Sequence, residues 1–214
     1  MTVPAAWTRV RDEAQTCTRC PLYAPATQSV FGEGPVEARI FMVGEQPGDQ
    51  EDRQGRPFVG PAGKVLDRAL AEAGIDRAEV YLTNAVKHFK FTMRGRRRLH
   101  QKPDTGEIEA CKFWLLQELE LLRPPIVVAL GATAARAITG RTVTIGRERG
   151  RLLPWGGEGQ RLLITVHPSF ILRVPDPAGQ EIEYARFLQD LRLVAPGAPE
   201  AAAAPARRRQ GSLL

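Results

Sequence analysis

The sequence predicts an α/β protein, a three-layer α/β/α sandwich around a four-stranded, mainly parallel sheet. Two observations predict this class. Short apolar runs of strand length alternate along the chain with segments of helical periodicity, which is typical of a parallel sheet covered by helices on both faces. The chain has 214 residues, of which 43% are hydrophobic, so it can form one sizeable core. Residues 1–194 are therefore expected to form a single domain.

Four apolar runs have the length and the bounding residues of buried strands. They span residues 39–43, 80–83, 126–130 and 162–165. Helical periodicity predicts four helices between and after them, at about 62–73, 105–122, 131–139 and 181–194. Asp104 and Glu107 form a capping-box arrangement at the start of the second helix, and Gly74 follows the first helix where a C′ glycine belongs.

The charge of the chain favours a polyanionic partner such as nucleic acid, because the net charge is +6. Part of the excess lies in Arg207, Arg208 and Arg209, within the Ala/Pro/Arg-rich segment 195–214, which is expected to be a disordered tail. No apolar run approaches the roughly 20 residues of a membrane helix, and the first residues do not follow the pattern of a signal peptide. We therefore expect a protein that stays in the cytoplasm without membrane contact.

Polar side chains follow the predicted strands at the edge of the sheet where the carboxyl ends of parallel strands meet. They are Glu45, Gln46 and Asp49 after the first strand, Asn84 and His88 after the second, Thr133 after the third, and His167 and Ser169 after the last. Ligands of parallel α/β sheets bind at this edge. The sequence therefore predicts a polar site there.

The three cysteines do not suggest a disulfide framework. Cys17 and Cys20 form a Cys-x-x-Cys pair, and Cys111 stands alone in the second predicted helix. Cys111 shares an apolar stripe with Ile108 and Leu115, so an inert buried thiol is the alternative to a metal ligand.

Four motifs carry a resemblance to a known family. They are the Cys-x-x-Cys pair, the Gly-Glu-Gln-Pro-Gly segment at 44–48, the strand end at 82–84, and the His-Pro-Ser segment at 167–169. Together they resemble the uracil-DNA glycosylase superfamily, in its iron–sulfur-containing family 4 branch. The similarity extends over nearly all residues from Cys17 to Leu191.

Three departures from ordinary family 4 resemble its X-type class, UdgX, whose members attach covalently to the abasic site that they create. Gln46 stands where family 4 usually has Ala, His88 stands where it has a cluster-binding Cys, and a basic insertion occupies 96–100. The resemblance implies excision of uracil from DNA, with single-stranded DNA favoured, followed by linkage of His100 to C1′ of the abasic site. A turning-over family 4 enzyme and a non-catalytic module that binds uracil-DNA are the alternatives.

The resemblance also implies a uracil pocket. Phe58 would stack on the flipped base. Asn84 would select uracil, because an amide matches its O4 acceptor and N3–H donor and mismatches cytosine. His167 would donate a hydrogen bond to uracil O2, Gln46 would contact the base or orient its loop, and Asp49 would hold water or the sugar. A core position for Phe58 and for His167, and a turn or helix cap for Asn84, are the alternatives to these roles.

His100 is the predicted nucleophile. Neutral imidazole is a competent nucleophile, and its unperturbed pKa of about 6.5 leaves it largely neutral at pH 7. The neighbouring arginines are expected to disfavour the protonated form further. Glu45 resembles the family residue that assists this histidine. Without the resemblance, a histidine in an Arg-rich loop would be assigned to phosphate contact.

The resemblance assigns DNA contact to Arg96, Arg97, Arg98 and Ser169. The arginines would neutralise phosphates near the flipped nucleotide and make binding salt-dependent. A solvated charged loop is compatible with this role. The protein is expected to act on DNA as a monomer.

Four residues match the cluster ligands of the resembling family: Cys17, Cys20, His88 and Cys111. Three thiolates and one imidazole could hold a [4Fe–4S] cluster or a zinc ion. The resemblance favours the iron–sulfur cluster, with a structural role in tying the N-terminal segment to the sheet.

Overall fold

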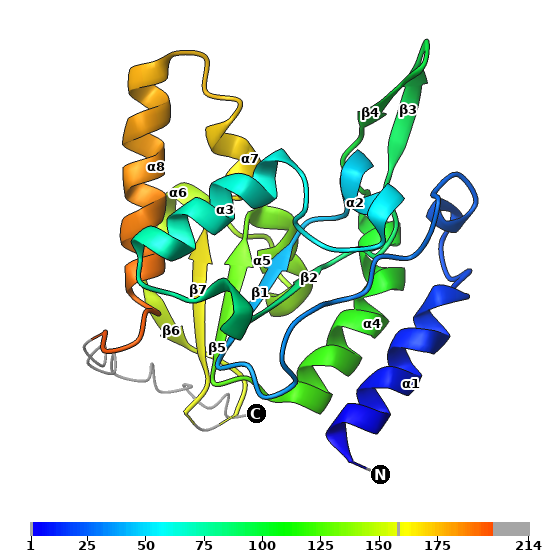
Figure 1. Cartoon of the computed structure of the whole chain (residues 1–214), viewed down its shortest axis with the longest axis horizontal. Coiled ribbons are helices and arrows are strands. Elements are labelled where there is room, and N and C mark those ends of the chain that lie inside the picture. The colour runs from blue at the N-terminus through cyan, green and yellow to red at the C-terminus, as the bar shows by residue number, and fades with distance from the viewer. Residues whose placement is uncertain (1, 158, 199–214) are drawn as a thin grey trace, which may run out of the picture.

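A five-stranded sheet forms the middle layer of the computed structural model, which describes residues 2–157 and 159–198 (Figure 1). Its strand order is β2-β1-β5-β7-β6, the first four strands are parallel, and β6 pairs antiparallel with β7. The strands are β1 (Ile40–Gly44), β2 (Val80–Asn84), β5 (Ile126–Leu130), β6 (Leu152–Pro154) and β7 (Arg161–Thr165). The four predicted strands are these parallel strands, each within one residue at either end. The prediction of four strands was one short, because β6 has only three residues, none of them buried, and gives no apolar run.

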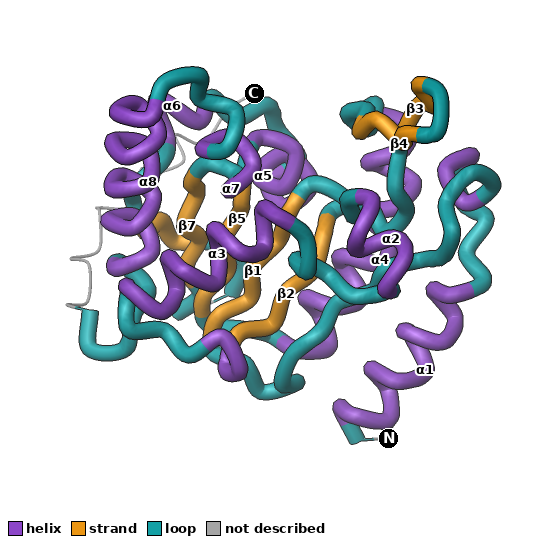
Figure 2. The backbone as a smooth tube through the Cα atoms, turned by 45° about the horizontal axis from the view of Figure 1, so that its top comes forward, coloured by secondary structure: helices purple, strands orange, loops and turns teal. Residues whose placement is uncertain are grey.

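Alternate residues of each strand point to opposite faces of the sheet, and each face is covered by helices (Figure 2). Phe41 and Val43 pack with one group of helices, and Ile40 and Met42 pack with the other. The first group is α1 (Val3–Gln15), α4 (Thr105–Leu122) and α5 (Ala132–Thr139), and the second is α3 (Pro61–Glu72), α7 (Pro168–Ile171) and α8 (Pro177–Arg192). The three-layer α/β/α sandwich predicted from the sequence is confirmed.

The predicted helices are present with small changes at their ends. The capping box of α4 forms as predicted, with Asp104 accepting from the Glu107 backbone N–H at 3.0 Å and Glu107 accepting from the Asp104 N–H at 2.7 Å. Helix α8 begins at Pro177, four residues before the predicted start, because Asp176 caps it by accepting from the Gly179 N–H. The sequence patterns missed α1, α2 (Asp49–Gln54), α6 (Ile145–Glu148) and α7.

The basic insertion is an antiparallel hairpin, β3 (Phe91–Arg94) and β4 (Arg97–His100), which stands apart from the main sheet (Figure 1). Arg94 pairs with Arg97, so the turn has two residues, and Gly95 with φ 59° is the first of them. A glycine at this position suits the tight turns that match strand twist. The sequence analysis expected a loop at this place.

The predicted tail begins within the described part of the chain and continues beyond it. Ala195 is buried in the core beside α8, so the packed domain extends at least one residue past 194. Residues 199–214 lie outside the described residues. Within the residues that the structure describes, no helix has the length and apolar character needed to cross a membrane. The cytoplasmic location stays a prediction.

Candidate functional site

A pocket of about 400 Å³ opens at the carboxyl ends of the parallel strands, beneath the hairpin. It brings together most of the residues that the sequence analysis assigned to catalysis and base recognition, although they come from five separate segments of the chain. Its wall includes Gln46, Asp49, Phe58, Asn84, His100, His167 and Ser169. Glu45 lines an adjoining pocket of about 740 Å³, and the two pockets share His167 and Arg173.

Phe58 is held in the pocket wall by two glycines. Its backbone has a φ of 56°, a left-handed conformation that side chains other than glycine rarely adopt. A Cβ on Gly63 would lie 1.8 Å from the Phe58 carbonyl oxygen, and a Cβ on Gly44 would lie 2.7 Å from the Phe58 ring. The ring stacks with His167 at 5.9 Å between centroids. Strain of this kind concentrates at functional sites, where the surroundings fix the conformation.

Asn84 is the last residue of β2, and its side chain is only 2% exposed. Its carboxamide oxygen lies against Gly44, where a Cβ would come within 2.3 Å of it. The amide makes no hydrogen bond to the other residues that the structure describes, and it borders the pocket. Asn84 therefore presents a fixed donor and a fixed acceptor to a ligand.

His167 carries its ring proton on the nitrogen that faces away from its own loop. Its Nδ1 accepts from the Ser169 backbone N–H at 3.2 Å and lies 2.8 Å from the Ser169 hydroxyl. Arg173 donates to the same hydroxyl at 3.0 Å, so the hydroxyl proton points to Nδ1 and the imidazole proton is on Nε2. Burial, with smaller contributions from Arg173 and His100, lowers the pKa of His167 to about 4. At pH 7 His167 is a neutral N–H donor.

His100 ends the hairpin at the rim of the pocket, with 49% of its side chain exposed. Its Nε2 lies 3.6 Å from Oε1 of Glu45, and Thr133 at the start of α5 donates to Oε2 of the same carboxylate at 2.5 Å. Burial lowers the pKa of His100, Glu45 raises it and Arg173 lowers it, and the net shift is downward. The lowering was predicted, but the arginine that contributes is Arg173 and not the Arg-rich run of the hairpin.

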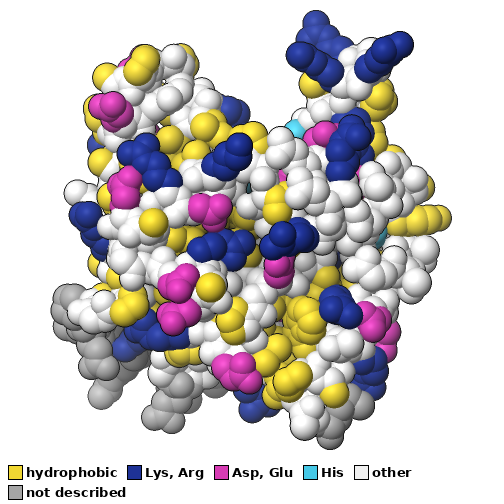
Figure 3. Space-filling model, in the orientation of Figure 1, with side chains coloured by type: hydrophobic (Ala, Val, Ile, Leu, Met, Phe, Trp, Pro, Cys, Tyr) yellow, Lys and Arg dark blue, Asp and Glu magenta, His cyan; other side chains and the backbone are white. Residues whose placement is uncertain are grey.

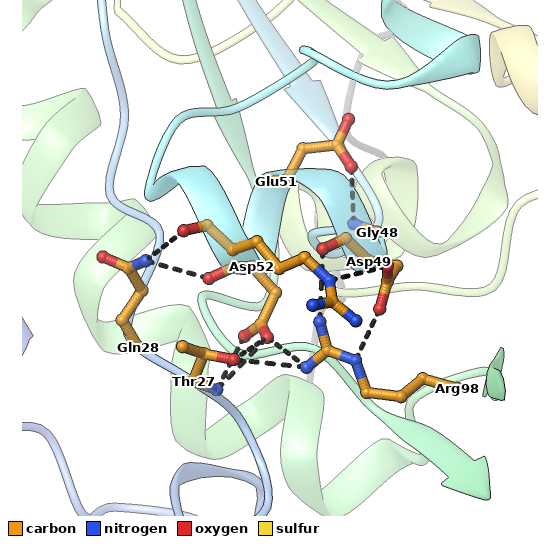
Figure 4. Close-up of polar contacts among 8 residues, drawn as sticks. Thr27, Gln28, Gly48, Asp49, Glu51, Asp52 and Arg98 are labelled. Atoms are coloured by element: carbon orange, nitrogen blue, oxygen red, sulfur yellow. Dashed lines mark hydrogen bonds and ion pairs between the residues drawn. The ribbon is translucent and has the colours of Figure 1, made fainter. Parts of the chain in front are cut away.

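Arg98 anchors the hairpin to α2 (Figure 4). Its guanidinium donates to Asp49 Oδ1 and to Asp52 Oδ2, both at 2.5 Å, and to the Thr27 hydroxyl at 3.2 Å. Asp52 is fully buried and also accepts from the Thr27 backbone N–H. Burial raises the pKa of Asp49 and hydrogen bonds from Arg53 and Arg98 lower it, with a net lowering, so its carboxylate stays ionised. Arg98 is thus engaged within the protein, although the sequence assigned it to DNA phosphates.

Gln46 fixes the base of the same hairpin. Its amide oxygen accepts from the Lys90 N–H at 3.1 Å, and its amide nitrogen donates to the carbonyls of Lys90 and Gln101. Lys90 and Gln101 are the residues that flank the two strands. Of the two roles predicted for Gln46, these bonds support the orientation of the loop.

Two arginines of the hairpin, Arg96 and Arg97, are exposed at its turn. Figure 3 shows that Lys and Arg side chains gather on this projection. Ser169 lies in the pocket wall and bonds to His167, as described above. The sequence analysis did not name Thr27 or Arg173, and it named Thr133 without giving it a partner. They act through contacts between segments far apart in the chain, which no local motif reveals.

The predicted cluster ligands are all buried, and the three cysteines lie on the face of the sheet covered by α1 and α4. Cys17 accepts from Trp114 Nε1 at 3.0 Å, and Cys111 accepts from the Lys87 backbone N–H at 3.1 Å. N–H groups directed at sulfur are usual around cluster thiolates. His88 Nδ1 is buried without a hydrogen-bond partner among the described residues, as expected of a nitrogen that binds a metal group.

The same residues do not converge on one point. Within residues 2–157 and 159–198, no group of three or more His, Cys, Asp or Glu side chains has the arrangement needed for a single metal ion. Burial raises the pKa of Cys111 to about 12 and lowers the pKa of His88, so in the protein alone these are a neutral thiol and a neutral imidazole.

Comparison with known proteins gives a consistent result. The family model described as the uracil DNA glycosylase superfamily matches residues 31–192. A type-4 uracil-DNA glycosylase of Thermotoga maritima is 42% identical over 165 residues, which are 77% of this chain and 82% of that protein. Type-4 uracil-DNA glycosylases of Pyrobaculum aerophilum (34% over 178 residues; 80% and 87%) and Saccharolobus solfataricus (35% over 173 residues; 78% and 77%) are also similar. The matched span contains every pocket residue described above.

Proposed function

We propose a self-trapping reaction for this chain. The chain belongs to the uracil-DNA glycosylase superfamily and acts as a uracil-DNA glycosylase. In the proposed reaction it excises uracil and becomes covalently linked through His100 to C1′ of the abasic site. The observation that carries the proposal is the position of His100. A hairpin with two separate anchors holds this imidazole beside the Glu45 carboxylate, at the rim of the pocket that contains Phe58, Asn84 and His167.

Excision would use the pocket wall. The base is flipped out and stacks on Phe58, and Asn84 pairs with O4 and N3–H. When the glycosidic bond breaks, its electron pair leaves with uracil and the sugar becomes an oxocarbenium ion. The Nε2–H of His167 would donate to O2 of the departing anion, and the ionised Asp49 would stabilise the positive charge on the sugar.

Capture would use the hairpin. A lone pair on one ring nitrogen of neutral His100 forms the bond to C1′, and the other ring nitrogen keeps its proton, which gives an imidazolium. Glu45 stabilises this positive charge and can accept the proton, leaving a neutral alkylated imidazole. Water is the competing nucleophile, and its attack would give a free abasic site.

DNA would contact the exposed arginines of the hairpin turn, Arg96 and Arg97, together with Ser169. Arg98 would contribute indirectly, because it orients the hairpin through Asp49 and Asp52. Single-stranded DNA is the preferred substrate in this proposal, since the base is most accessible in a single strand. The active form in the proposal is a monomer.

A [4Fe–4S] cluster held by Cys17, Cys20, His88 and Cys111 is part of the proposal. Its support is the buried, unpartnered Nδ1 of His88 and the N–H groups directed at two of the sulfurs. When bound, the cluster would supply structural linkage between the N-terminal segment and the sheet. A zinc ion is the alternative, and a brown colour with visible absorbance distinguishes the two.

The test is incubation with uracil-containing single-stranded DNA followed by a denaturing gel. We expect a slower-migrating protein–DNA band that persists in denaturant, and its loss in His100→Ala while free uracil is still released. Turnover without a band would support an ordinary family 4 reaction. Absence of uracil release at every protein-to-DNA ratio would indicate a binding module.

A further inference from the structure

A buried ion pair contacts the backbone of the pocket residue Asn84 and has no role in the reaction described so far. Lys87 Nζ and Glu118 Oε2 are 2.5 Å apart, and both side chains are 0% exposed. The ammonium group donates its three protons to three acceptors: Glu118, the Thr83 hydroxyl at 2.5 Å and the backbone carbonyl of Asn84 at 2.9 Å. A lysine has no further donor, so this group is saturated.

Glu118 is satisfied just as fully. It accepts from the Gly32 backbone N–H at 3.0 Å, from the Tyr81 hydroxyl at 2.9 Å and from the Thr83 hydroxyl at 3.0 Å. The Tyr81 hydroxyl in turn accepts from Trp7 Nε1 at 2.7 Å. The carboxylate therefore connects α1, the segment before β1, the strand β2 and α4 around the ammonium group.

Stability alone does not account for such a pair. Removing two charges from water is costly, and apolar residues of similar volume often replace a buried ion pair at no cost in stability. The distinctive feature is what the ammonium group holds. It binds the carbonyl of the residue whose side chain forms the base-reading wall, at the turn where β2 ends. Two further bonds fix the same turn to the pocket loop, from the Ala85 N–H to the Gly44 carbonyl and from the Val86 N–H to the Glu45 carbonyl.

We propose that Lys87 and Glu118 form a positioning pair that fixes Asn84 for recognition of uracil, an inference that rests on the proposed role of Asn84. Lys87 holds the backbone of Asn84, and Glu118 holds Lys87. A small displacement of the Asn84 amide would lengthen its hydrogen bonds to the base and weaken recognition. Misplacement of a group by about 1 Å can lower the rate about a hundredfold. The Lys87 bond to Cys111 uses the backbone N–H, so a change of its side chain leaves that contact in place.

The test is the double variant Lys87→Met/Glu118→Gln in the full-length protein. It removes both charges together, keeps the side-chain volumes similar, and leaves an amide oxygen to accept from Gly32 and Tyr81. Uracil release is measured under single-turnover conditions, with protein in excess over single-stranded DNA that contains one uracil. We expect the maximal rate constant to fall by about tenfold or more. The half-saturating protein concentration should stay within about twofold, since the phosphate contacts are elsewhere.

Tyr81→Phe is the matched control. It removes a hydrogen bond to the same carboxylate at the same burial, at Oε1 and not at the Oε2 that Lys87 contacts. It is expected to lower the melting temperature without changing the maximal rate constant. Visible absorbance per protein should be equal in wild type, control and double variant, because the cysteine contacts are untouched.

A second variant covers the case in which the double variant does not fold. Thr83→Val keeps the side-chain shape and both charges and removes one of the three acceptors of the ammonium group, so a smaller decrease of the maximal rate constant is expected. A folded double variant, or Thr83→Val, with the wild-type rate constant overturns the proposal. Asn84→Ala separates this failure from a failure of the proposed function: if it releases uracil at the wild-type rate, Asn84 does not read the base.

Discussion

Asn84 and Phe58 lie in a wall built from the main sheet and the start of α3, whereas His100 lies at the end of a hairpin outside the sheet. The wall is packed to the point that Gly44 has no room for a Cβ. The hairpin is exposed, with Met93 60% accessible, and the bonds of Gln46 and Arg98 tie it to the pocket loop and α2. In the proposed reaction, recognition of the base would therefore depend on dense packing, and delivery of the nucleophile would depend on a few polar anchors. The two functions should be separable by mutation.

The largest expected effect is on the wall. Gly44→Ala introduces a Cβ that would lie 2.3 Å from the Asn84 carboxamide and 2.7 Å from the Phe58 ring, so both must move. Uracil release should fall by about a hundredfold or more under single-turnover conditions, because reacting groups lose their alignment. Retained DNA affinity would show that the hairpin is intact.

Gly106→Ala is the control for this variant. Its Cβ would lie 3.4 Å from the nearest side-chain atom, in the first turn of α4, and its φ is not positive. We expect wild-type release from it. A wild-type rate in Gly44→Ala would show that the wall is more compliant than its packing indicates. The contrast between a rigid wall and a loosely anchored hairpin would then be wrong.

The next effect is on the hairpin. Arg98→Gln leaves Asp49 and Asp52 without their shared partner and loosens the hairpin that carries His100. We expect the yield of covalent adduct on a denaturing gel to fall by about tenfold, since capture competes with attack by water. Uracil release should fall less than the adduct yield, because Asp49 keeps its bond to Arg53. Equal losses of release and adduct would contradict the separation of the two functions.

The sequence was informative about the wall and less so about the hairpin, for a physical reason. Buried strands are apolar runs bounded by turn residues, so β1, β2, β5 and β7 could be predicted, and with them the positions of Asn84 and His167. None of the hairpin residues is buried, and its place is set by bonds between residues 46 and 49 apart in the chain, from Arg98 to Asp52 and Asp49. Pairing at that separation leaves no periodic signal. The expected phosphate contact of Arg98 was reasonable for an isolated arginine, and only the fold shows its partners.

The pH dependence should differ between the two functions. Neutral His100 is the proposed nucleophile, and burial lowers its pKa from the ordinary value of about 6.5. Adduct formation should therefore rise with pH and reach its plateau at a lower pH than an ordinary histidine would give. Release should persist at lower pH, because His167 stays a neutral donor down to its pKa of about 4. Glu45 raises the pKa of His100, so Glu45→Gln should move the acid limb of adduct formation to lower pH. Single-turnover gels between about pH 5 and 8 test this, and a limb displaced to higher pH would be inconsistent with it.

The smallest expected effect separates the two kinds of arginine on the hairpin. Arg96→Gln removes an exposed charge at the turn, and it should reduce the slope of log affinity against log salt by up to about 1 if that side chain meets a phosphate. Its adduct yield at saturating protein should match wild type.

Arg98→Gln changes the net charge equally, but two carboxylates already neutralise Arg98, so its salt slope should change little. Fluorescence anisotropy with single-stranded DNA at several salt concentrations gives both slopes. Both variants lose one positive charge, but Arg98 is paired with two carboxylates and Arg96 is exposed. A lower salt slope only in Arg96→Gln would locate the phosphate contact at the turn. A lower adduct yield only in Arg98→Gln would show that the Arg98 anchor positions His100.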